Sequence, residues 1–150
     1  MKKTLLLAAA AASLLATPVL AQSAHMTANY GEIHLSAGFT PDPYNVEMHA
    51  GGGSSANHLP GACIGNISEA PDFEITYDAG SLPLVFRTLS RADTTLVING
   101  PDGRWYCDDD SYGDGDAEVR FGRPQSGTYD IWVGVFGETA PATLIITETP

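Results

Sequence analysis

The segment YDIWVGV, residues 129–135, carries the pattern that decides the fold. Every second residue in it is apolar and large, namely Tyr129, Ile131, Val133 and Val135. Between them stand Asp130, Trp132 and Gly134. Because the side chains of a β-strand point alternately to opposite faces, this pattern predicts a strand with one face in a core.

The same two-residue period recurs in other parts of the chain. It is clear in YNVEMH (44–49), FEITYD (73–78) and AEVRF (117–121). Further candidate strands, rich in β-branched residues, are EIHLS (32–36), LVFRTL (84–89), TTLVI (94–98) and ATLIITE (142–148). No ten-residue window after residue 21 carries the apolar stripe of a helix. The chain is therefore expected to be all-β.

Turn signals separate these segments at short spacing. NGPDG (99–103) places proline and aspartate at the centre of a type I turn, which should lead into a strand through Trp105. RPQSG (123–127) separates the next two strands in the same way. About eight short strands with such turns predict an antiparallel β-sandwich of jelly-roll type. The main irregular region is residues 50–67.

The first 21 residues have the features of a Sec signal peptide. A positive start, MKK, precedes an apolar run, and the small residue Ala21 precedes the expected cleavage point. Removal of 21 residues from the 150-residue chain leaves 129, a length that suits one domain. We expect residues 22–28 to be a flexible mature N-terminus and residues 29–150 to form the β-sandwich domain. No later segment is long and apolar enough to span a membrane, so the protein is expected in the periplasm or outside the cell.

The mature chain is expected to be strongly acidic. It keeps 18 acidic residues against five arginines, because Lys2 and Lys3 both lie in the signal peptide, so its net charge is about −13. Such a chain repels nucleic acid and anionic membranes and attracts cations and basic partners. The expected ligand is therefore a protein or a polysaccharide and not a nucleic acid; no oligomeric state is predicted.

The cysteine content predicts one disulfide. Cys63 and Cys107 are the two cysteines of the sequence, and an exported chain with two cysteines usually joins them. The bond would tie the irregular region of residues 50–67 to the rest of the domain and stabilise the fold by about 4 kcal/mol in the chain-entropy model.

Catalysis is not expected. The sequence has no HExxH zinc motif, no P-loop and no dinucleotide-binding fingerprint, and GGGSSA (51–56) lacks the final glycine of a nucleophile elbow. The four histidines are interpreted as surface residues: His25, His34, His49 and His58. A carboxylate pair like that of glycoside hydrolases leaves no local motif, so a small secreted hydrolase of this kind stays open as an alternative.

The segment WYCDDDSYGDGD, residues 105–116, places five aspartates in twelve residues. Its spacing does not fit an EF-hand, yet a calcium ion would offset the repulsion between neighbouring carboxylates. The other interpretation is a solvated loop whose aspartates cap turns. Trp105, Tyr106 and Tyr112 are candidates for an aromatic platform that binds a ligand, although a tryptophan can equally well cover one sheet.

Residues 92–136 resemble the bacterial pre-peptidase C-terminal (PPC) domain family. The shared pattern is Asp-Thr before a strand, a Pro-Asp-Gly turn, Asp-Asp-Ser, and then G-x-Y-x-I-x-V, which starts here at Gly127. The resemblance covers about a third of the chain and implies a β-sandwich of jelly-roll type. It also implies an accessory domain of secreted peptidases; some relatives bind collagen and calcium. Asp93, Asp109 and Asp110 are the positions at which calcium ligation would carry over.

This chain departs from the family pattern in two ways. It has no peptidase domain, so it would be a stand-alone exported member, and its two cysteines are not part of the general pattern. We therefore expect an exported, non-catalytic accessory or binding module; calcium stabilisation and a solvated loop whose aspartates cap turns both stay open. The alternatives are the carboxylate-pair hydrolase and a structural protein of the cell envelope.

Overall fold

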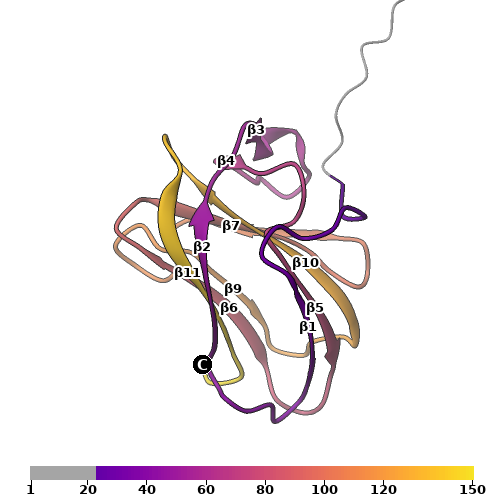
Figure 1. Ribbon diagram of the computed structural model, residues 1–150. Coiled ribbons are helices and arrows are strands. Elements are labelled where there is room, and N and C mark those ends of the chain that lie inside the picture. The colour runs from indigo at the N-terminus through magenta and orange to yellow at the C-terminus, as the bar shows by residue number, and fades with distance from the viewer. Residues whose placement is uncertain (1–22) are drawn as a thin grey trace, which may run out of the picture.

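The computed structural model describes residues 23–150, which form two packed β-sheets (Figure 1). The expected signal peptide, residues 1–21, lies outside the described residues. The longer strands are β1 (Glu32–Ser36), β2 (Tyr44–Ala50), β5 (Phe73–Asp78), β6 (Leu84–Ser90), β7 (Thr94–Asn99), β8 (Trp105–Asp108), β9 (Glu118–Phe121), β10 (Gly127–Val135) and β11 (Ala140–Thr147). The irregular region adds β3 (Ser54–Ser55), the 3₁₀ turn η1 (Ala56–His58) and β4 (Asn66–Ile67).

The strands are divided between two sheets. The first sheet has the order β1-β5-β10-β7-β8, and the short β4 and β3 extend it beyond the far end of β10. The second sheet has the order β2-β11-β6-β9. All neighbours are antiparallel except β1 and β5, which pair in parallel. The parallel pair is possible because the chain crosses to the second sheet and back between β1 and β5.

The predicted β-sandwich with one disulfide is confirmed, while the jelly-roll connectivity stays a prediction. The turn in NGPDG is also confirmed, because the Gly103 N–H donates to the Gly100 carbonyl at 2.9 Å between the paired strands β7 and β8. RPQSG does not join two paired strands as NGPDG does. It connects β9 of the second sheet to β10 of the first sheet. No helix among residues 23–150 is long and apolar enough to cross a membrane.

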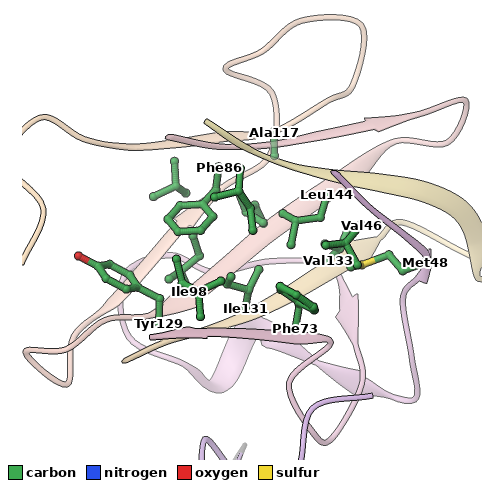
Figure 2. Close-up of a cluster of buried hydrophobic side chains, with 14 of the residues drawn as sticks. Val46, Met48, Phe73, Phe86, Ile98, Ala117, Tyr129, Ile131, Val133 and Leu144 are labelled. Carbon is green, nitrogen blue, oxygen red and sulfur yellow. The ribbon is translucent and has the colours of Figure 1, made fainter. Parts of the chain in front are cut away.

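The main core lies between the two sheets. The alternation seen in YDIWVGV sends Tyr129, Ile131 and Val133 inward from β10. Figure 2 shows these side chains facing Phe86 and Leu144, which come from the second sheet. Both sheets thus bury their period-two apolar faces against each other, which is the main driving force of a sandwich.

A second, smaller core covers part of the outer face of the first sheet. Trp132 and Val97 point outward from β10 and β7, yet both are fully buried. The irregular region lies over them, and its Ala56 and Ile67 complete the cluster. At Gly134 the cover comes so close that an added Cβ would lie 3.0 Å from the Asn66 carbonyl oxygen.

The disulfide holds this cover in place. Cys63 of the irregular region is joined to Cys107 of β8, with 5.2 Å between the two Cα atoms, a separation normal for disulfides. Because Cys107 alternates with Tyr106, its side chain lies on the outer face of the sheet, where the cover is. The bond therefore fixes residues 51–67 against the sheet.

Candidate functional site: an acidic cavity on the outer face of the first sheet

A row of acidic side chains crosses the part of the outer face that the irregular region does not cover. In the sheet register, Glu32 of β1 is opposite Glu74 of β5, and Glu74 is opposite Asp130 of β10. Asp130 is in turn opposite Asn99 of β7. In the antiparallel pair of β5 and β10, directly opposite residues bring their Cβ atoms to about 4.5–5.5 Å. Glu32 adjoins Glu74 across the parallel pair of β1 and β5, so the three carboxyl groups form one continuous row.

This row forms the floor of a cavity of about 710 Å³. Residues 24–27, which precede β1, form one side of the cavity. The β7–β8 turn and the start of β10 form the other side, with Gly100, Pro101 and Gly127 among the lining residues. A volume of this size falls within the range of about 300–1,000 Å³ that is typical of ligand sites.

Asp130 is the most unusual residue of the cavity. It is only 6% exposed, and its Oδ1 atom has no hydrogen-bond partner among the protein atoms. Burial, then the charge of the neighbouring Glu74 carboxylate and a hydrogen bond with it, raises the pKa of the Asp130 carboxyl to about 7. A buried carboxylate oxygen without a partner is costly, so Asp130 Oδ1 is where a ligand donor would contribute most.

The charge of the cavity favours a cationic ligand. Its titratable lining residues within the described chain are His25, Glu32, Glu74 and Asp130, with no lysine or arginine. Like charges directly opposite each other on a sheet destabilise it, and a bound cation would remove that repulsion. Across residues 23–150, no group of three or more His, Cys, Asp or Glu side chains is arranged to hold a metal ion. The acidic lining of the cavity is thus complementary to a positively charged ligand.

The three aromatic residues expected to form a platform lie in different places. Trp105 points outward and packs on Trp132, with ring centroids 5.4 Å apart. Tyr106 points inward and donates its hydroxyl hydrogen to Asp102 at 2.7 Å. Tyr112 lies in the following loop, where the Arg87 guanidinium lies 4.8 Å from its ring centroid. The structure does not bring the three together, because adjacent strand residues point to opposite faces.

The aspartates proposed as calcium ligands lie near the β8–β9 loop. Burial raises the pKa of the Asp109 carboxyl, and the charges of Asp110, Asp108 and Asp93 raise it further, so these carboxylates lie close enough to repel one another. Asp108 caps the loop, because it accepts hydrogen bonds from the Ser111 and Glu118 N–H groups. Calcium ligation by Asp93, Asp109 and Asp110 stays a prediction.

The acidic row was not found by sequence reasoning. Glu32, Glu74 and Asp130 are far apart in the chain, and alternation marks Glu74 and Asp130 only as outward positions of their strands. One signal was available: all three flank apolar core positions of strands that were correctly located. Their alignment depends on the order and register of the strands, which alternation within one strand does not specify.

The chain shows only limited similarity to known proteins. No family model matches the chain, and no curated protein matches it. Among solved structures, it is similar to PliG of Aeromonas hydrophila, a periplasmic lysozyme inhibitor of g-type lysozyme, with a TM-score of 0.43 and 14% identity. The similarity covers 77% of this chain and 96% of that chain. A likeness in fold of this kind does not determine a ligand.

Proposed function

We propose that the protein is an exported, non-catalytic binding module whose ligand is a basic protein. The observation that carries this proposal is the acidic cavity, in which Asp130 is buried with an unpartnered oxygen beside Glu74. The cavity lies on the part of the first sheet that the irregular region does not cover, and sites built on strands are positioned more precisely than sites built on loops.

The net charge of the chain and its disulfide support the same proposal. The strong negative charge would increase the rate at which a basic partner meets the cavity, by long-range attraction that salt weakens. The Cys63–Cys107 disulfide suits an oxidising compartment outside the cytoplasm. The relation to the PPC family and the calcium stabilisation that it implies belong to this proposal and rest on the motifs of residues 92–136.

Site-specific photo-cross-linking tests which surface binds the partner. A photoreactive amino acid replaces either Thr128, exposed beside the cavity, or Asn45, exposed on the outer face of the second sheet. Each variant is mixed with extracytoplasmic proteins of the organism that produces the chain. We expect Thr128 to cross-link a basic protein, and we expect high salt or the Glu32→Gln/Glu74→Gln double substitution to abolish the cross-link.

Asn45 serves as the matched control, because it is also an exposed strand residue but lies on the opposite side of the sandwich. Equal cross-linking from both positions, or a Thr128 product that survives high salt and the double substitution, would contradict the proposal. The absence of any product from Thr128 would contradict it as well.

The carboxylate-pair hydrolase is the second candidate, and one observation favours it. Glu74 and Asp130 are opposite each other on neighbouring strands, and the pKa of the Asp130 carboxyl is raised to about 7. Retaining glycosidases place two carboxyl groups about 5–5.5 Å apart and raise the pKa of one of them. Release of reducing ends from peptidoglycan or chitin oligomers, lost in Asp130→Asn, would support this candidate over a binding module.

A further inference from the structure

The floor of the cavity offers hydrogen-bond acceptors in a particular arrangement. Asp130 and Glu74 present two carboxyl groups side by side on neighbouring strands, and Asp130 Oδ1 is without a partner. Asn99 lies on the other side of Asp130, and its amide nitrogen donates to the Arg104 carbonyl at 3.4 Å. The side-chain oxygen of Asn99 is therefore the atom that would accept a hydrogen bond from a ligand. The row is thus rich in acceptors and needs a ligand that carries several donors.

A guanidinium group fits this floor better than an ammonium group. Guanidinium is planar, carries five N–H donors in a fixed fork, and can bridge two neighbouring carboxylates, whereas ammonium is a compact point charge. Guanidinium is also more weakly hydrated and keeps its proton when buried, which matters beside a side chain that is only 6% exposed. Gly100, Pro101 and Gly127 form the adjoining wall, against which the methylene stem of an arginine would lie.

We propose that the acidic cavity binds one arginine side chain of the protein partner, with its guanidinium bridging Asp130 and Glu74. This inference rests on the proposed function and names the group that the site recognises. It requires Asp130 to be ionised in the complex, so arginine binding and deprotonation of Asp130 are coupled. Raising the pH from about 5.5 to about 8.5 should therefore strengthen binding.

The contribution of Asp130 to the pH dependence of binding has to be separated from the contributions of the other titratable groups that line the cavity. Glu32 of β1 and Glu74 of β5 are acidic neighbours of the site, and His25 of the N-terminal segment faces it from the side. Protonation of His25 at low pH would also repel an arginine. A His25→Gln variant removes that contribution, and we expect it to keep the pH dependence.

Nuclear magnetic resonance titration with a blocked alanine–arginine–alanine tripeptide tests the inference. We expect saturable shifts of the backbone amide signals of Gly100, Gly127 and Thr128. Asp130→Asn should weaken binding by about tenfold, the loss expected for one hydrogen bond between charged groups, and should abolish the pH dependence. Glu138→Gln changes the same charge on an exposed loop beyond the far end of β10 and should leave the affinity within about twofold of wild type.

Matched peptides with lysine or citrulline in place of arginine complete the experiment. Citrulline has the shape of arginine without the charge and should not bind; lysine should bind at least about threefold more weakly. Equal binding of citrulline, equal or tighter binding of lysine, or an unchanged affinity of Asp130→Asn would overturn the inference. If these peptides fail while Thr128 still gives its salt-sensitive cross-link, only the arginine site is refuted; failure of both refutes the proposed function.

Discussion

At the scale of single residues, β10 shows how two outward positions of one strand differ. Trp132 and Asp130 both point away from the main core, and both are buried. Trp132 is covered by the disulfide-linked irregular region and forms a second core. Asp130 lies two residues earlier, where the cover ends and the cavity begins, and its Oδ1 atom has no partner in the protein.

Asp130→Asn should change the pH dependence of stability. The Asp130 carboxyl has a pKa of about 7 in the folded protein against an ordinary value of 3.8, so the folded state binds more protons than the unfolded state between these values. The free energy of unfolding of the wild type should therefore fall as the pH rises from about 4 to about 7. Asparagine cannot ionise, so the variant should be more stable than wild type by up to about 4 kcal/mol near pH 8 and little changed near pH 4.

Urea unfolding across this pH range measures the difference, and Glu138→Gln is the control for a general loss of negative charge. A variant that loses as much stability at high pH as the wild type would show that Asp130 does not titrate in this window.

Gly134→Ala should destabilise the protein through steric conflict. An added Cβ would lie 2.3 Å from Thr95 Oγ1 of β7, and 2.9 Å from Ile67 Cγ2 and 3.0 Å from the Asn66 carbonyl oxygen, both within the cover. Overpacking of this kind costs about 1–3 kcal/mol. Gly122→Ala is the matched control, because no heavy atom lies within 4 Å of a Cβ added there. Thermal unfolding of both variants should show a clear loss for Gly134→Ala only; equal midpoints would contradict the close packing.

At the scale of elements, the irregular region acts as a cover for the first sheet and not as a free loop. Its short β4 pairs with the end of β10, and its side chains pack on Trp132 and Val97. The covalent link to β8 compensates for its short strands, because two-residue strands provide few hydrogen bonds of their own. The second core therefore depends on the disulfide more than the main core does.

Replacement of both Cys63 and Cys107 by alanine should loosen this cover before the sandwich unfolds. We expect a loss of about 2–4 kcal/mol in the free energy of unfolding, in line with the span of 44 residues that the bond closes. Trp132, fully buried under the cover, should become more accessible, and tryptophan emission should shift to longer wavelength. An unchanged emission spectrum together with unchanged stability would mean that packing alone holds the cover.

At the scale of the whole molecule, strand register assembles the candidate site. Glu32, Glu74 and Asp130 come from β1, β5 and β10, and they meet because β5 pairs with both of the other strands. Along each of these strands the acidic residue is next to residues that point into the main core. The acidic row and the main core therefore lie on opposite faces of the first sheet. A shift of one residue in the pairing would bury the acids and expose the core, which makes this register strongly favoured.

Calcium, if it binds as the PPC resemblance implies, should stabilise the whole domain. Binding to the folded state alone raises the melting temperature, and we expect a rise of about 3 °C or more in excess calcium relative to EDTA. Asp109→Asn/Asp110→Asn should remove the difference because it removes two of the expected ligands, while Glu47→Gln, on the outer face of the second sheet, should keep it. Identical melting curves in calcium and EDTA would refute the calcium proposal.

The strands, the turn at residues 99–103 and the disulfide were predictable because each depends on a local pattern or on a count of two cysteines. The order of the strands and the parallel pairing of β1 with β5 were not, since both depend on contacts between distant segments. For the same reason the aromatic residues at 105, 106 and 112 appeared to be one group in the sequence and lie apart in the structure.

The sequence alone determined that this chain forms an acidic, disulfide-linked β-sandwich, because strand periodicity, turn residues, charge and cysteine content are properties of short segments or of composition. Only the tertiary structure decided which acids share a surface and which outward residues are covered. The physical reason is that burial and charge proximity arise from pairing between β1, β5, β10 and β7, and from the packing of residues 51–67 on the sheet.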